Sequence, residues 1–247
     1  MSPKKGFLMK IVIFLCLLSF TLLMGANNNA DSILSETEVV MIEKGVLGEA
    51  IKSKDYDTIS TMALSFNATS LSPSYTGNAK KLWKRSIELF ELCHKGGYIV
   101  SSLYLVQNFL KSNPKYSRRI AIESIKYNQN NEKARYNSSY VNMVMLYVSS
   151  VLDHTSSSKD EVNFALEALQ SLPEENAQTK FYSAFLFKSL GSDDIANMYL
   201  NDACHSSRPG SAIYSYCING DNIEMEDLLQ SKVSNPDCNK DIGQRCK

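Results

Sequence analysis

Histidine and cysteine are the side chains of this protein best suited to nucleophilic chemistry. Among three histidines and six cysteines, two adjacent pairs stand out, Cys93-His94 and Cys204-His205. A thiol nucleophile needs a base and a third group that orients the base, and adjacency in the sequence does not bring three groups together. Each pair lies near a predicted helix end, where histidine commonly contacts free carbonyl groups. We therefore predict no catalysis at either pair.

Other motifs for chemistry are missing from the sequence. The histidines, of which the third is His154, do not occur in His-x-x-x-His spacing, and there is no Cys-x-x-Cys. No glycine-rich phosphate loop, Gly-x-Ser-x-Gly elbow or paired-carboxylate signature occurs either. We predict no catalytic residue, no metal and no cofactor. Two segments, Asn67-Ala68-Thr69 and Asn137-Ser138-Ser139, match the glycosylation acceptor pattern, which matters only in a host that glycosylates.

The remaining cysteines suggest disulfides near the carboxyl end. Beyond Cys16, four of the five cysteines lie in the last 44 residues. An oxidising compartment allows them to pair, and a local framework is the simplest arrangement, with Cys204 bonded to Cys217 and Cys238 bonded to Cys246. Cys93 is left over. The alternative is that some of these cysteines are buried free thiols, because connectivity cannot be read from a sequence.

The first residues have the order of a secretory signal peptide. Three lysines precede an apolar run from Ile11 to Met24, which ends in Gly25-Ala26 and a polar stretch. The run has 14 residues, whereas a membrane span needs roughly 20, so an uncleaved anchor is the less favoured alternative. We predict cleavage after Ala26, with Gly25 or Ala30 as other possible positions, and a periplasmic or secreted protein. Cys16 lies inside the run, which argues against a lipoprotein.

Cleavage would leave 23 basic and 26 acidic residues, a net charge of −3. A nucleic-acid partner is not expected, because phosphate binding needs a concentrated basic face. The basic groups Lys80-Lys81 with Lys84-Arg85, and Arg118-Arg119, are interpreted as solvated helix faces. No second apolar segment is long enough to span a membrane.

The pattern of apolar residues predicts an all-α protein built from stacked antiparallel helix pairs. Ser35-x-x-Glu38 is a capping box that opens a helix with an apolar face reaching Ile51. Gly96-Gly97 and the prolines after residue 72 fall between apolar periodic segments. The expected helices after the first are 55–66, 80–94, 99–111, 116–127, 132–152, 160–172, 176–190, 193–205, 212–218 and 223–232.

These elements suggest the following organisation. Residues 1–26 form the signal peptide, 27–66 a helical hairpin, and 67–77 a polar loop rich in serine, threonine and proline. A helical-repeat domain follows over 78–232, and a cysteine-containing tail over 233–247.

A repeated small residue supports the repeat interpretation. Ser86, Ala121, Ala165 and Ala196 each follow a larger residue and precede mostly apolar positions three and four residues later, at separations of 35, 44 and 31. Two-helix repeats have a period near 34 and place a small residue where the paired helices cross closely. The alternative is an irregular helical bundle in which such positions recur by chance.

The best single unit runs from Tyr182 to Gly191 and on to Cys204. It resembles the tetratricopeptide and SEL-like repeat family: a helix ending in Leu190-Gly191, a short turn, and a second helix carrying Ala196, Tyr199 and Ala203. The cysteine that ends this helix, with another in the next, is similar to exported bacterial SEL-like proteins, in which such cysteines join neighbouring helices. Here the spacing is longer, because Arg208-Pro209-Gly210 extends the turn. The resemblance covers about residues 80–218 and is strongest over 180–204.

Two classes of function are compatible with these features. The resemblance implies a non-enzymatic binding protein that grips a protein partner, either as a periplasmic scaffold for an envelope-assembly component or as an immunity-type inhibitor of a toxin. The competing class is an exported enzyme, such as a hydrolase, whose site is dispersed over several helices. Most tyrosines at helical spacing are expected in the core, with some on a concave binding face.

Overall fold

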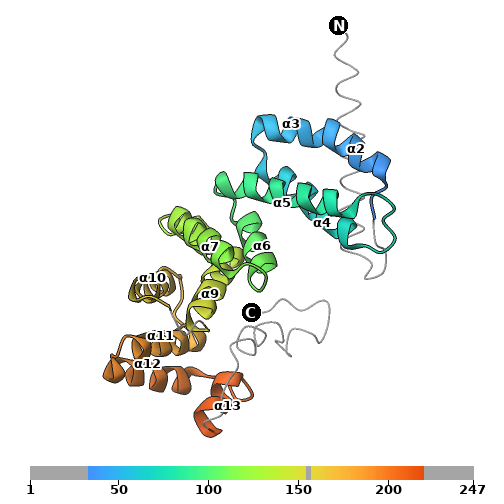
Figure 1. The fold of residues 1–247 in the computed structure, drawn as a ribbon. Coiled ribbons are helices and arrows are strands. Elements are labelled where there is room, and N and C mark those ends of the chain that lie inside the picture. Colours follow the sequence, from blue (N-terminus) through green and yellow to red (C-terminus); the bar gives the residue numbers. More distant parts are fainter. Residues whose placement is uncertain (1–32, 154–156, 220–247) are drawn as a thin grey trace, which may run out of the picture.

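The computed structural model describes residues 33–153 and 157–219, and these fold into α-helices joined by turns and loops, without a strand (Figure 1). The predicted signal peptide at 1–26, the predicted helix at 223–232 and the predicted cysteine-containing tail at 233–247 lie outside the described residues. Among the described helices, none has the length and apolar character to cross a membrane. The helices are α2 (Glu36–Lys44), α3 (Val46–Ser53), α4 (Tyr56–Leu71), α5 (Ala79–Lys95), α6 (Ile99–Phe109), α7 (Pro114–Asn128), α8 (Glu132–Arg135), α9 (Ser138–Leu152), α10 (Lys159–Gln170), α11 (Ala177–Ser189), α12 (Asp193–Ser206) and α13 (Ala212–Asn219).

The predicted capping box begins α2. The Ser35 hydroxyl accepts a hydrogen bond from the Glu38 amide at 3.3 Å, and the Ser35 amide donates to Glu38 Oε2 at 2.7 Å. Hydrogen bonds from the Ser35 amide and hydroxyl lower the pKa of the Glu38 carboxyl. The apolar face was expected to continue to Ile51 in one helix, but the chain breaks at Gly45 into α2 and α3. Glycine favours such a break because it is a poor helix former.

Two other boundaries differ from the sequence-based expectation. Helix α4 continues to Leu71 rather than ending at 66, so the segment predicted as a loop over 67–77 begins at Ser72. The expected helix over 132–152 is divided into α8 and α9, because the Asn137 side chain accepts a hydrogen bond from the Ser139 amide at 2.8 Å and caps α9. Asparagine is a strong helix N-cap, and this one starts a new helix.

The helices pack in neighbouring pairs: α4 with α5, α6 with α7, α9 with α10, and α11 with α12. Figure 1 shows these pairs following one another along an elongated molecule, from α2 and α3 at one end to α13 at the other. One cluster of buried hydrophobic side chains runs from Leu34 to Ile213. Each pair therefore shares its core with the next pair.

The four repeated small residues all lie on the second helix of a pair. Ser86 is on α5, Ala121 on α7, Ala165 on α10 and Ala196 on α12, and their exposed fractions are 0%, 1%, 0% and 5%. Small side chains at buried positions let a helix approach its neighbour closely.

The Gly96-Gly97 turn joins α5 to α6 at a point where two tyrosine rings cover the backbone. A Cβ atom at Gly96 would lie 2.2 Å from the Tyr56 ring, and one at Gly97 would lie 2.1 Å from the Tyr127 ring. Gly97 also has a φ of 80°, a region that residues with a Cβ rarely adopt. The turn thus needs glycine both for its conformation and for the packing of α4 and α7 over it.

Ala196 provides a test of the close approach of α12. Replacing Ala196 with leucine should overpack the contact and lower the free energy of unfolding by about 1–3 kcal/mol. Asn197, the next residue, is exposed, so Asn197→Leu should have a far smaller effect. Thermal unfolding of both variants measures the difference. Wild-type stability for Ala196→Leu would show that no close crossing exists at this position.

Candidate functional site

His94 joins three helices through its two ring nitrogens. Nδ1 lies 2.9 Å from the Ser102 hydroxyl on α6, and Nε2 lies 3.0 Å from Glu123 Oε2 on α7. The histidine side chain is 9% exposed. Serine, imidazole and carboxylate therefore stand in series, which is the composition of a hydrolase triad.

The position of the serine indicates a structural role for this series. Ser102 has an exposed fraction of 0% and also contacts the Tyr98 carbonyl at 3.2 Å, so a substrate has no access to its hydroxyl. Cys93 is equally buried, its Sγ lies 3.6 Å from the Tyr56 carbonyl oxygen, and burial raises the pKa of its thiol. The adjacent Cys93 and His94 thus face different partners. We interpret the hydrogen bonds of His94 as structural contacts that hold α5, α6 and α7 together.

The two residues of the second cysteine–histidine pair have separate structural roles, one in a disulfide and the other at a helix end. Cys204 is bonded to Cys217, with 5.7 Å between the Cα atoms, and the bond joins α12 to α13 as predicted. His205 Nδ1 lies 2.8 Å from the Asn201 carbonyl oxygen in its own helix. His154 and the predicted Cys238–Cys246 bond lie outside the described residues. Within the described part, no three histidine, cysteine or acidic residues are grouped as metal ligands would be.

The tyrosines occupy both core and partly exposed positions. Tyr182 is fully buried, with its hydroxyl 3.1 Å from that of Ser149, as expected for a core tyrosine. Tyr98 donates a hydrogen bond to Asp57 at 2.6 Å, and burial, followed by this bond, raises the pKa of its phenol. Tyr199 is half-buried and stacks on Phe187 with 5.4 Å between ring centroids.

The two glycosylation motifs differ in accessibility. Asn67 is 3% exposed within α4 and donates a hydrogen bond to the Tyr104 hydroxyl at 2.6 Å, and Thr69 is 1% exposed. An enzyme cannot reach this asparagine in the folded protein. Asn137 is exposed at the start of α9.

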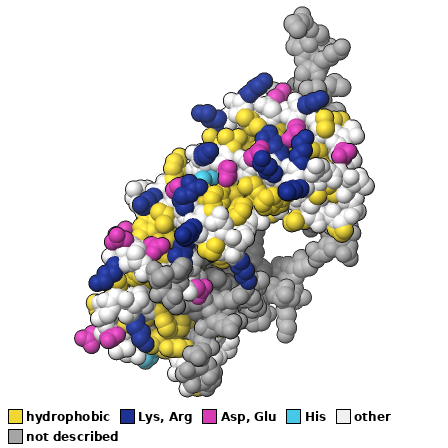
Figure 2. Space-filling view, viewed as in Figure 1, with side chains coloured by type: hydrophobic (Ala, Val, Ile, Leu, Met, Phe, Trp, Pro, Cys, Tyr) yellow, Lys and Arg dark blue, Asp and Glu magenta, His cyan; other side chains and the backbone are white. Residues whose placement is uncertain are grey.

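A surface hollow lies between α2 and α5, and we call it the α2/α5 groove. Its volume is about 590 Å³. Val39 and Leu82, which are 9% and 5% exposed, form its apolar floor, and Val40, which is 46% exposed, adds an apolar wall. Figure 2 shows basic and acidic side chains gathered with hydrophobic atoms on the visible face of this end of the molecule. The remaining lining residues are Glu36, Glu43, Tyr75, Asn78, Lys81, Lys84, Arg85 and Glu88.

The two walls of the groove carry opposite charge. Helix α2 contributes Glu36 and Glu43, whereas α5 contributes an excess of basic residues. Arg85 bridges the walls at one point, with Nε 3.0 Å from Glu43 Oε1 and Nη1 3.3 Å from Glu88 Oε2. Lys81 and Lys84 are exposed, and no carboxylate of the described residues lies within ion-pair distance of either. They remain available for a ligand.

Tyr75 and Glu36, which both line the groove, lie against the backbone of Gly77. A Cβ atom at Gly77 would lie 2.5 Å from the Tyr75 hydroxyl and 2.6 Å from Glu36 Cγ, so both side chains pack against the bare backbone. Burial, and secondarily the negative charge of Glu36, raises the pKa of the Tyr75 phenol. No local pattern in the sequence indicates that the acidic face of α2 lies opposite the basic face of α5, so this site could not be predicted from the sequence.

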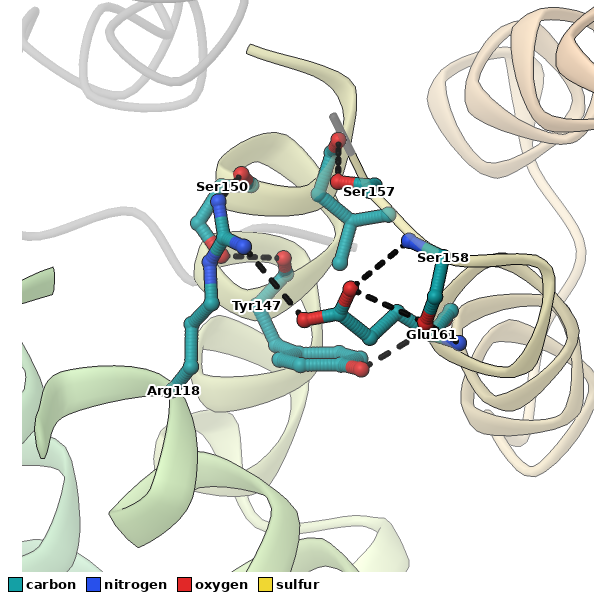
Figure 3. Close-up of polar contacts among 7 residues, drawn as sticks. Arg118, Tyr147, Ser150, Ser157, Ser158 and Glu161 are labelled. Carbon is teal, nitrogen blue, oxygen red and sulfur yellow. Dashed lines mark hydrogen bonds and ion pairs between the residues drawn. The ribbon is translucent and has the colours of Figure 1, made fainter. Parts of the chain in front are cut away.

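Arg118 is not part of a solvated face, contrary to the sequence-based interpretation. Its side chain is 13% exposed, whereas that of Arg119 is 60% exposed, as predicted. The Arg118 guanidinium donates to the Ser150 carbonyl near the end of α9, and its Nη1 lies 3.4 Å from Glu161 Oε1 at the start of α10 (Figure 3). The Tyr147 hydroxyl donates to the Glu161 carbonyl at 3.4 Å. The cluster joins α7 to the turn between α9 and α10.

Comparisons with protein-family models, with curated proteins and with solved structures found no match for this chain.

Proposed function

We propose that this protein is an exported, non-enzymatic binding protein, in which tetratricopeptide- or SEL-like helix pairs hold a protein partner. The observation that carries the proposal is the α2/α5 groove, with its apolar floor and its two walls of opposite charge. The biological role that fits is either a periplasmic scaffold or an immunity-type inhibitor that blocks a toxin, because each requires surface complementarity rather than chemistry.

The groove favours an amphipathic helix as the bound segment. An apolar strip along such a helix would cover Val39, Val40 and Leu82, in the way that amphipathic helices dock in hydrophobic grooves. Acidic side chains on one edge of the helix would face Lys81 and Lys84, and basic side chains on the other edge would face Glu36. A nucleic acid is a poor occupant, since the acidic wall would repel its phosphates.

Two further features support the wider proposal. The Cys204–Cys217 disulfide is expected in an oxidising compartment, in agreement with the predicted signal peptide. The four buried small residues occur once on the second helix of each of four pairs, which is the arrangement that a helical repeat requires.

Charge reversal in the groove tests the proposal. Affinity capture from the native host identifies the partner, and its affinity is then measured for the wild type and for Lys81→Glu/Lys84→Glu. The double variant should bind at least about ten-fold more weakly, because it removes both unpaired cations and introduces repulsion. Its thermal unfolding should be unchanged, since both lysines are exposed.

Lys133→Glu is the matched control, because Lys133 is an exposed lysine on α8 outside the groove. It should bind the partner as the wild type does. Equal affinity for the double variant and the wild type would contradict binding in the groove. A captured toxin whose activity is inhibited identifies an immunity role, and a captured envelope-assembly component identifies a scaffold. A toxin-like gene beside this one would agree with the first outcome.

The alternative of an exported hydrolase receives no support from the one serine–histidine–carboxylate series in the described part of the chain. Its serine, Ser102, is fully buried. A dispersed site would have to use other residues.

A further inference from the structure

A second hollow lies at the other end of the molecule, between α10, α11 and α12. Its volume is about 300 Å³. Thr179, Ser183 and Phe187 line it from one stripe of α11, because residues four apart share a helix face. Leu166 and Leu169 of α10 and Leu172 beyond it form an apolar side, and these leucines are 5–8% exposed. Tyr199 of α12, stacked on Phe187, forms an aromatic wall. We call this hollow the α11 pocket.

Ser183 presents a hydroxyl to the α11 pocket that has no hydrogen-bond partner among the described residues. Ser183 is 8% exposed, and its hydroxyl makes no hydrogen bond to any described residue. The neighbouring Thr179 hydroxyl, by contrast, donates to the Asn176 carbonyl at 2.9 Å. Hydroxyl groups at such low exposure are generally hydrogen-bonded. Ser183 can therefore accept a hydrogen bond from a ligand that enters the pocket.

The rim of the α11 pocket is acidic. Glu174 and Glu175 lie there, both exposed, and no basic side chain of the described residues is within ion-pair distance of either carboxylate. The negative rim would repel an anion and attract a cation. The apolar and aromatic interior, in turn, suits an aliphatic chain, and aromatic faces attract cations.

We propose that the α11 pocket binds a primary ammonium group carried on a short aliphatic chain. The chain lies against Leu169 and Phe187, and the ammonium donates hydrogen bonds to Ser183 and faces Glu174 and Glu175. A lysine side chain of a protein and a free alkylamine share this chemistry. The pocket lies on different helices from the α2/α5 groove, so the proposal stands independently of the proposed function.

Titration of the full, disulfide-intact chain tests this site, with amide chemical shifts of α11 as the readout. The charged probes are N-acetyl-lysine-N-methylamide and n-butylammonium. The neutral counterpart of the first is N-acetyl-norleucine-N-methylamide, and that of the second is n-butanol. The charged probes should bind at least about five-fold more tightly than the neutral ones, because only they satisfy the acidic rim.

Variants then assign the binding to named residues. Glu174→Gln/Glu175→Gln should weaken the charged probes by about five-fold or more, and Ser183→Ala by about two- to five-fold. Glu167→Gln is the matched control, because Glu167 is exposed on α10 but does not line the pocket. It should leave affinity unchanged, and thermal unfolding should confirm that all variants are folded.

The two sources of the ammonium group give different results. Tighter binding of the lysine derivative than of n-butylammonium supports a side chain from a protein partner, and equal binding supports a free amine. Equal affinity for charged and neutral probes, undiminished binding to the double glutamine variant, or no binding of either charged probe would overturn the proposal.

Discussion

Replacing Cys204 with serine should lower the free energy of unfolding by about 2–4 kcal/mol, because the disulfide no longer restrains the unfolded chain. The bond closes a short loop between Cys204 and Cys217, with a sequence separation of 13. Helix α13 has only 8 residues, and short helices are marginal without tertiary contacts. Its remaining contacts include Ile213, which is 6% exposed, and Tyr216, whose ring meets Phe181 edge-on at 5.2 Å.

Two measurements check this prediction. Chemical unfolding of the wild type and the variant under non-reducing conditions measures the stability loss. Thiol titration of the unfolded, unreduced proteins should find one more free thiol in Cys204→Ser, at Cys217. Cys204→Ser/Cys217→Ser is the control: it should be about as unstable as the single variant and should lack the additional thiol. Identical thiol numbers for the wild type and Cys204→Ser would contradict the disulfide.

Replacing Arg118 with alanine should cost about 2–3 kcal/mol, since hydrogen bonds to charged groups are worth more than neutral ones and their loss leaves buried partners unmatched. The Ser150 carbonyl would lose a donor and Glu161 would lose its cation. The expected loss of stability is smaller than for a fully buried ion pair because the Glu161 side chain is 32% exposed. Three helices, α7, α9 and α10, meet at this cluster (Figure 3).

Arg119→Ala is the control from the adjacent residue. Its guanidinium is exposed, pairs with Glu123 at 3.7 Å and lies over the Tyr116 ring, so its loss should cost under about 1 kcal/mol. Denaturant unfolding of both variants at neutral pH measures the contrast. Equal losses for Arg118→Ala and Arg119→Ala would contradict a buried role for Arg118.

The Arg118 effect should also depend on pH. Hydrogen bonds from Ser158, and then the nearby Arg118, lower the pKa of Glu161 below its ordinary value of 4.5, against the opposing effect of burial. A lowered pKa in the folded state stabilises the protein above the unfolded pKa, and this contribution is lost as the pH falls through the folded value. The stability difference between the wild type and Arg118→Ala should therefore narrow in acid. A constant difference down to acidic pH would show that Glu161 is not the partner.

Short-range features of the sequence predicted much of the secondary structure. The Ser35 capping box, the Gly96-Gly97 turn and the all-helical class agree with the structure. Each depends on residues a few positions apart, because helices begin and end through contacts within one turn. The Cys204–Cys217 bond could also be proposed from the sequence, since the two cysteines are near each other in the chain.

Helix boundaries were less predictable where a tertiary contact or a single capping residue outweighs the surrounding sequence pattern. Asn67 and Thr69 have the composition of a loop, yet both are buried in α4, where Thr69 accepts a hydrogen bond from the Leu34 amide at 3.3 Å. Tertiary contacts of this kind outweigh intrinsic preference. Asn137 acts in the opposite direction, because its capping hydrogen bond divides an otherwise continuous helical pattern.

The sequence alone therefore determined the helical class, most helix ends and the recurrence of small residues at Ser86, Ala121, Ala165 and Ala196, and it offered the Cys204–Cys217 pairing that the structure confirms. Only the tertiary structure decided that Arg118 is buried while Arg119 is exposed, that the acidic side of α2 faces the basic side of α5, and that Ser183 opens into a pocket with an acidic rim. The physical reason is the separation along the chain of the residues that determine each feature. Helix formation depends on neighbours three or four residues away, whereas burial, charge pairing and pockets depend on which helices meet, and side chains far apart in the chain determine that packing.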